Sequence, residues 1–417
     1  MSHWFHRNPL KATAPVGFEL RQVLTTNDTG KICSELRLTR IRLLELLTDP
    51  NNDRTSVESE FRKYFAYFQG FLLPIDANGT DSKLRPLIRY KWTQSLLGYV
   101  PTELSDSWFE IVSMCINMAL WYMKHAAKVA ASDEVAEEEA KEVHTSLRKA
   151  AGLFAYAQQE KARLNETAEP ESDLDPRVLS AYMNECTAEA QEITVARAIE
   201  LAHKADLISA LSHETAKLFQ AANDSLGSQM NVAIFEKWKK YLELKTQFYL
   251  AYAHAYNGES LLGEDKCGDA VRSCKESEAC LQKAEALCKE YAKARGPGKN
   301  AKPESHLFFR RLRPILKRHL EKAERENGFI YHQKVPEEIP ELPSKATYGL
   351  VKPDEFQPPE PVELWSPTTY AAFDITKAPM PDFKKSQKST KELPQVKEAP
   401  VYQTEKDPKN NSGCIIS

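Results

Sequence analysis

The feature that most constrains the fold is a helical spacing of apolar residues, which recurs along the first three quarters of the 417-residue chain. Between residues 31 and 49, for example, Ile32, Leu36 and Leu43 fall on one helical face among charged residues. The predicted helices are all longer than the ~11 residues of an average globular helix, which favours a mainly α, elongated helical array over a compact bundle. They cover residues 31–49, 83–98, 105–131, 136–165, 175–203, 206–222, 230–257, 263–293 and 304–326.

The stretch 249–293 is the most regular part of this pattern. Cys274, Leu281 and Cys288 recur every seven residues, which indicates that these cysteines pack in the core. With a loop expected at Gly258, the stretch predicts a helical hairpin like those of tetratricopeptide proteins. The chain lacks a strict period of about 34 residues, so a true repeat array is not predicted.

Two short segments break the helical pattern. Residues 18–24 alternate between apolar and polar like a strand, and residues 328–333 are aromatic and β-branched. The sequence therefore predicts a small β-sheet near the N-terminus, which the later segment could join.

The composition changes after residue 335. Thirteen of the 24 prolines lie between 336 and 417, which prevents long helices there. Up to about residue 378 this part still carries large apolar residues, so we expect it to lie extended over the helical body. From 379 onward Lys, Glu, Ser and Pro dominate, as is typical of a flexible tether. We predict one domain over 1–378 and a flexible tail over 379–417.

Composition and motifs argue against several classes of protein. The 56 basic and 59 acidic residues give a net charge of −3, which does not favour nucleic acid as a partner. The longest apolar run, 111–123, is too short to span a bilayer, and the first residues lack the apolar core of a secretion signal. Neither the cysteines nor the histidines have zinc-binding spacing, and the GPGK sequence at 296–299 lacks the pattern of a phosphate loop. We therefore expect a cytoplasmic, non-enzymatic protein without a metal or cofactor.

The last four residues, Cys414-Ile415-Ile416-Ser417, have the form of a prenylation box. A thiol, two apolar residues and a free terminus on a reachable tail are what a prenyltransferase needs, and the terminal serine points to a farnesyl group. The alternative is a chance cysteine near the end of the chain. One lipid gives only weak, reversible membrane binding, so a second contact must come from the folded body or a partner.

Residues 306–322 form a basic helix. Arg310, Arg313 and Lys317 share one face of it, with Arg311 and Arg318 nearby. This face could contact anionic lipid, or it could be an ordinary solvated surface above a buried apolar stripe.

Several segments together resemble the Bro-domain family, which includes Alix, and in particular a short, prenylated type of member. They are His3-Trp4-Phe5-His6-Arg7-Asn8-Pro9-Leu10-Lys11, Ala188-Glu189-Ala190-Gln191-Glu192, Gly328-Phe329-Ile330-Tyr331 and the terminal box. The resemblance covers residues 1–378 and implies a boomerang-shaped helical domain with a tetratricopeptide-like middle and a small sheet. It also implies an ESCRT accessory protein, whose Bro domain binds the C-terminal amphipathic helix of an ESCRT-III subunit of the charged multivesicular body protein class.

The resemblance places an apolar binding groove at Leu207 and Leu211, with Thr194 on the preceding helix. Independently, residues 207–219 are apolar over a wider face than one buried stripe requires, as a groove wall would be; a helix buried on two sides would look the same. A charge placed at Leu211 is therefore expected to remove binding without unfolding the domain. The resemblance further implies that Arg148 pairs with the acidic partner helix and that Tyr348 and Leu350 border the groove.

The leading hypothesis is a monomeric adaptor that binds ESCRT-III while its farnesyl group contacts a membrane where ESCRT-III acts, such as the endosome or nuclear envelope. A peripheral lipid binder that depends on the basic helix is the second hypothesis. A prenylated enzyme is the third, although no catalytic motif supports it.

Overall fold

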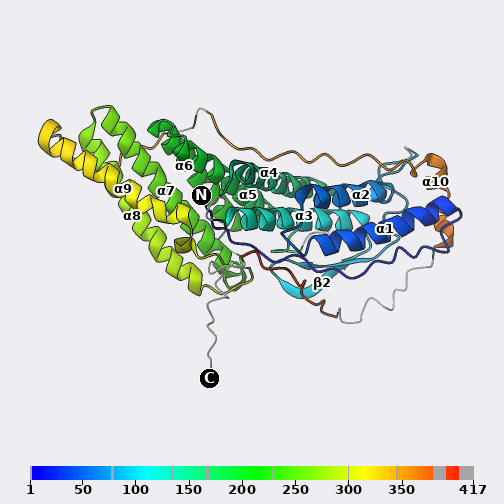
Figure 1. The fold of residues 1–417 in the computed structure, drawn as a ribbon. Helices are drawn as coiled ribbons and strands as arrows, with labels where there is room; N and C mark the ends of the chain where they lie inside the picture. Colours follow the sequence, from blue (N-terminus) through cyan, green and yellow to red (C-terminus); the bar gives the residue numbers. More distant parts are fainter. Residues whose placement is uncertain are drawn as a thin grey trace, which may run out of the picture.

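The computed structural model describes residues 2–76, 79–132, 135–164, 169–227, 230–298, 300–343, 346, 348–378 and 391–402. Within these ranges the chain is mainly helical, with one two-stranded antiparallel sheet (Figure 1). The main elements are α1 (Asn27–Leu46), α2 (Arg54–Leu72), β1 (Tyr90–Gln94), β2 (Gly98–Leu104), α3 (Ser107–Ala130), α4 (Glu137–Glu160), α5 (Pro176–Glu200), α6 (Ala205–Leu226), α7 (Val232–Gly263), α8 (Cys267–Lys293), α9 (Leu307–Glu326) and α10 (Pro367–Ala371).

The helices form an elongated, bent array. Each helix from α3 to α8 packs against the next one along the chain, and α9 packs on both α7 and α8. One arm holds α1 to α3 and the other holds α7 to α9, and the two meet at an angle near α5 and α6 (Figure 1). This arrangement confirms the predicted boomerang-like helical fold.

Helix α3 runs through the core of the first arm. Asp106 caps its first turn by accepting a hydrogen bond from the backbone N–H of Trp108, and nearly all its side chains are buried. Burial on all sides explains why its sequence is so apolar. Among the described residues, none of the helices combines the length and apolar character that a membrane crossing requires.

The predicted sheet lies elsewhere in the sequence. Residues 18–24 form a turn with a single bridge from Leu24 to Phe373, and residues 327–331 form a π-helical turn that ends α9, so both strand predictions were wrong. The strands are β1 and β2, inside the segment 83–98 predicted as helix and just beyond it. Tyr90 and Trp92 alternate into the core there, and Gly98 takes the positive φ of +95° that the hairpin turn needs.

Two helix predictions also need correction. Helix α2 was missed, although Val57, Phe61, Tyr64 and Phe68 give it a clear apolar face. The loop expected at Gly258 is absent, because α7 continues through this residue to Gly263. A glycine is still required at 258, since a Cβ atom there would lie 2.4 Å from Cys274 Sγ on the neighbouring α8.

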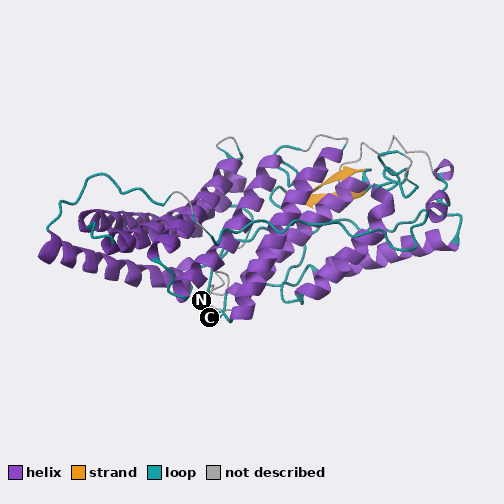
Figure 2. Ribbon diagram, turned by 90° about the horizontal axis from the view of Figure 1, so that it is seen from above, coloured by secondary structure: helices purple, strands orange, loops and turns teal. Residues whose placement is uncertain are grey.

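The proline-rich segment returns along the helical body, as predicted. Residues 332–366 contain no helix or strand where they are described, and long loops run lengthwise beside the helices in Figure 2. Trp365 and Phe373 anchor the end of this return in the core of the first arm. Trp365 packs directly on Gly70, where a Cβ atom would lie 2.5 Å from the indole ring.

Residues 391–402 lie against the body and are not part of a free tether. Val401 and Tyr402 are buried, and the Tyr402 hydroxyl donates to the carbonyl of Phe5 and accepts from its N–H, at 2.9 and 3.0 Å. Glu398 forms a buried ion pair with Lys124. The flexible tail predicted over 379–417 is therefore wrong for this segment, whose contacts come from residues far away in sequence. Cys414 lies outside the described residues.

Candidate partner-binding groove

The proline-rich residues 332–366 are called the returning segment below. A mainly apolar hollow of about 440 Å³ opens between α4, α5, α6 and the returning segment. Four of the six residues predicted as partner-binding line it: Thr194, Leu207, Leu211 and Tyr348. They come from three separate parts of the chain, and α5 and α6 bring the first three together. A hollow of this size is large enough for a few apolar anchor side chains from a bound peptide.

The lining residues differ greatly in exposure. Tyr348 is 59% exposed at the mouth, whereas Leu207 and Leu211 are only 7% and 1% exposed. The returning segment covers Leu211, because a Cβ atom on Gly349 would lie 3.3 Å from Leu211 Cδ2. The wide apolar face of α6 is thus largely buried on two sides. A charge at Leu211 would be buried, so we now expect Leu211→Asp to destabilise the fold, contrary to the expectation from sequence.

Arg148 contacts the returning segment in this structure. Its Nε donates to the carbonyl of Lys352 at 2.9 Å, and its own carbonyl accepts from the N–H of Asp354 at 3.0 Å. Gln191 holds the same segment through the Gly349 carbonyl and the Val351 N–H, both at 2.8 Å. Arg148 therefore helps to fix the segment that carries Tyr348, and Leu350, 37% exposed, lies on that segment but does not line the hollow.

The wall contributed by α4 was missed from sequence. Glu137, Ala140, Lys141 and His144 line the hollow with the i, i+3, i+4, i+7 spacing of one helical face. Arg197 of α5 reaches Glu137 across the rim at 3.5 Å. Burial lowers the pKa of His144, and the nearby charge of Arg148 lowers it further, so this imidazole is neutral at neutral pH.

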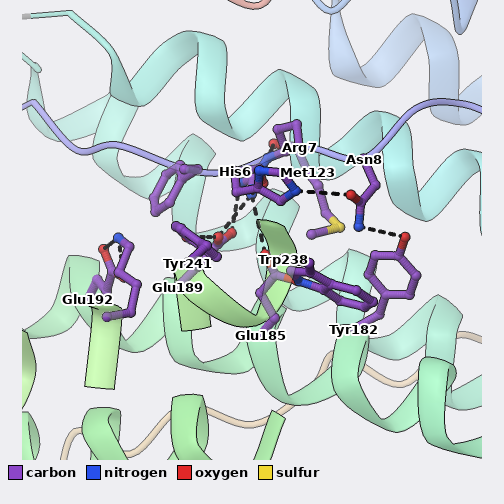
Figure 3. Close-up of polar contacts among 12 residues, drawn as sticks. His6, Arg7, Asn8, Met123, Tyr182, Glu185, Glu189, Glu192, Trp238 and Tyr241 are labelled. Carbon is purple, nitrogen blue, oxygen red and sulfur yellow. Dashed lines mark hydrogen bonds and ion pairs between the residues drawn. The ribbon is translucent and has the colours of Figure 1, made fainter. Parts of the chain in front are cut away.

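A buried polar network holds α5 in place next to the groove (Figure 3). Arg7 donates to both carboxylate oxygens of Glu189, at 2.9 and 2.7 Å, and Lys245 pairs with Glu192 at 2.7 Å. Trp238 Nε1 donates to Glu185 at 2.8 Å. The three carboxylates have the spacing of one inward helical face, so the Ala188–Glu192 motif joins α5 to the N-terminal segment and to α7.

The network uses other residues of the N-terminal motif as well. Asn8 donates to Tyr182 at 2.9 Å, and burial lowers the pKa of His6 to about 3, so its ring stays neutral. Within the described residues, no group of three or more His, Cys, Asp or Glu side chains is arranged to hold a metal ion. The arrangement fixes the position of α5 and therefore of the groove wall.

Glu185 should make stability depend on pH. Burial raises the pKa of this carboxyl well above its ordinary value, and the charge of Glu189 raises it further. The folded state then holds a proton that the unfolded state releases, so this group's contribution is complete below about pH 4.3 and is lost as the pH rises toward the folded pKa. Glu185→Gln, which keeps the neutral shape, should therefore gain stability relative to the parent chain as the pH rises.

Urea unfolding at a series of pH values measures this difference. Glu138→Gln, at a highly exposed side chain of α4, is the matched control and should leave the pH profile unchanged. An identical profile for the parent chain and Glu185→Gln would show that Glu185 is not held protonated by the fold.

The predicted basic face lies on α9. Arg310, Arg313, Lys317 and Arg318 are exposed and Arg311 is half-buried. Arg313 pairs with Glu285 of α8, and Lys317 lies 3.7 Å from Glu321. Arg311 and Arg318 also border a second hollow, of about 520 Å³, between α9 and the turn that joins α5 to α6.

Comparison with known proteins identifies the relatives of this chain. Residues 9–383 match the model of the BRO1-like domain. The chain is 52% identical to the BRO1 domain-containing protein BROX homolog of Caenorhabditis elegans, with all of both chains covered. It is 50% identical to the human BRO1 domain-containing protein BROX, over 92% of this chain and 93% of that one.

Solved structures give the same fold. A structure described as the ALIX BRO1 CHMP4C complex matches with a TM-score of 0.62 at 19% identity, over 87% of this chain and 98% of that one. A second, described as the structural basis for endosomal targeting by the Bro1 domain, matches with a TM-score of 0.63 at 20% identity, over 90% and 98% of the two chains.

Proposed function

Because the chain belongs to the BRO1-like domain family, we propose that it is an ESCRT accessory adaptor that binds the C-terminal amphipathic helix of a charged multivesicular body protein. The hollow beside α5 is the observation that carries this proposal. It combines an apolar floor with an exposed aromatic residue, Tyr348, and a rim of mixed charge. Helix-in-groove recognition uses such features, since a few apolar anchors supply most of the binding energy and rim charges set the orientation.

The relatives support this class of partner. CHMP4C is the named partner of the ALIX BRO1 domain in the solved complex, and the same fold carries the hollow here. In this proposal the protein acts as a non-enzymatic monomer, without a cofactor and without binding nucleic acid. It works in the cytoplasm, at membranes where ESCRT-III acts.

We further propose that Cys414 carries a farnesyl group. Its thiol would displace diphosphate from a prenyl diphosphate, forming a thioether and releasing a proton. Tyr402 is held on the body, and Cys414 follows it by only twelve residues in the sequence, so the lipid would be attached close to a fixed point. Two weak contacts, one to ESCRT-III and one to lipid, would then reinforce each other. The second candidate function, a lipid-binding scaffold, rests on the exposed basic face of α9.

Tyr348→Ala tests the groove. Tyr348 is mostly exposed, so its loss should leave the fold intact and weaken binding of a labelled CHMP4C C-terminal helix by about tenfold or more, equivalent to ~1.4 kcal/mol. Fluorescence anisotropy measures the affinity. Tyr99 of β2 is 48% exposed and does not line the hollow. Tyr99→Ala therefore removes a side chain of the same kind away from the proposed site, and this control should bind like the parent chain. Equal affinities for all three proteins would exclude the hollow as the binding site.

A further inference from the structure

Two adjacent large apolar residues are displayed at the outer end of α9. Phe329 is 81% exposed and Ile330 is 66% exposed, the highest values among the large hydrophobic residues of the described chain. They lie in the turn that directly follows α9, and α9 ends at the tip of the second arm (Figure 1). Scattered exposed apolar residues are common, but a neighbouring pair this exposed at an extremity indicates a contact with something apolar.

The turn that carries this pair is built and anchored. Asn327 and Gln333 close it through two hydrogen bonds, at 2.9 and 3.0 Å. The Gln333 side chain also accepts from the N–H of Gly268 at 2.9 Å and donates to the carbonyl of Asp265 at 2.7 Å. Gly268 permits this closeness, since a Cβ atom there would lie 2.4 Å from the carbonyl oxygen of Lys334. The turn is thus fixed to the start of α8.

The charge along α9 selects the kind of partner. Residues 307–320 contain five basic residues and no acidic one, and the last part of the helix, 321–326, adds three glutamates and two basic residues. The helix as a whole therefore has seven basic and three acidic residues, a net charge of +4. Arg310, Arg313 and Lys317 are exposed at spacings of three and four, which places them on one face of the helix. An apolar pair at the end of an exposed basic helix fits an anionic bilayer surface, where basic side chains meet headgroups and apolar side chains enter the interface.

The docked C-terminal segment meets the other end of the same helix. The ring of Tyr402 lies 6.0 Å from that of His306, the residue that precedes α9. Tyr402, the last described residue, therefore lies beside the start of α9, and Phe329 lies beyond its end, about 30 Å away for a 20-residue helix. Helix α9 thus carries the basic face, with Tyr402 beside its start and the apolar pair just beyond its end.

We infer that α9 is the membrane-facing edge of this protein and that Phe329 and Ile330 insert into the interface of an anionic bilayer. The strength of membrane binding in this orientation rests on the proposed farnesyl group. The insertion of Phe329 and Ile330 does not require that group. The lipid would hold one end of α9 and the apolar pair the other, so the domain would bind in a defined orientation.

An environment-sensitive dye attached at Ile330→Cys tests the insertion. The native cysteines among the described residues are buried, and position 414 is blocked either by the farnesyl group or by Cys414→Ser, so the dye goes to the introduced thiol. Vesicles of phosphatidylcholine with phosphatidylserine should shift the emission to the blue and raise it severalfold, in both the farnesylated and the Cys414→Ser chain. The control dye at Ile41→Cys, on exposed α1, should not respond.

The outcomes separate the insertion from the lipid anchor. Phe329→Ser should weaken vesicle binding of the Cys414→Ser chain about tenfold, whereas Leu38→Ser, at a residue of α1 that is 55% exposed, should not. A farnesylated chain that sediments with vesicles without a dye response at 330 would overturn the insertion and leave the anchor. A dye response in Cys414→Ser with no extra binding from farnesylation would overturn the anchor alone. Neither sedimentation nor response would overturn both.

Discussion

Arg7→Ala is expected to lower the free energy of unfolding by about 3–5 kcal/mol, because it leaves a carboxylate buried without its partner. Arg7 and Glu189 are each about 1% exposed or less and are joined by two hydrogen bonds. Arg7 Nε also donates to the carbonyl of Met123 at 2.6 Å. Burial alone would lower the pKa of Arg7, but Glu189 outweighs it and raises this pKa, so the guanidinium remains charged.

Urea unfolding at neutral pH measures this loss. Arg37→Ala, at an exposed arginine of α1, is the matched control and should change stability by less than about 0.5 kcal/mol. Combining Arg7→Met with Glu189→Gln should recover part of the loss, since neither position then carries a buried charge. Equal stability of Arg7→Ala and Arg37→Ala would contradict a central role for the network.

The sequence predicted those parts of the fold that depend on local spacing. Helices α3 to α9 follow from apolar residues that recur every three or four positions, and most of their predicted ends lie within a few residues of the observed ones, although α7 continues past its predicted end to Gly263. The hairpin did not follow, because Leu84, Leu87 and Ile88 imitate a helical face just before the alternation of β1 begins. The docking of residues 391–402 depends on Phe5, Leu10 and Lys124, whose proximity only the folded chain creates.

The site shows the same limit. Leu207, Leu211 and Thr194 line one hollow, since α5 and α6 are neighbours in sequence and in space. The burial of Leu211 was one of two alternatives that the sequence left open, because it comes from Gly349 on a segment that returns from far along the chain. The interaction of Arg148 with Lys352 is likewise long-range, so its exposed charge was assigned to a partner.

The returning segment is therefore the element on which the groove most depends, and Gly152 of α4 is where it is most closely packed. A Cβ atom at Gly152 would lie 1.7 Å from the carbonyl oxygen of Asp354, so no small adjustment could accommodate it. Gly152→Ala should push the segment away from α4 and weaken the Asp354 to Arg148 hydrogen bond. Overpacking of this kind typically costs about 1–3 kcal/mol.

The effect should reach the groove, because Gly349 and Tyr348 lie only a few residues before Asp354 on the same segment. Gly152→Ala should thus lower both the unfolding free energy and the affinity for the CHMP4C helix. Gly30→Ala in α1 is the matched control, since nothing lies within 4 Å of a Cβ there. It should stabilise its helix by about 0.5–1 kcal/mol and bind normally. If Gly152→Ala bound the helix like Gly30→Ala despite its lower stability, the returning segment would not be part of the binding site.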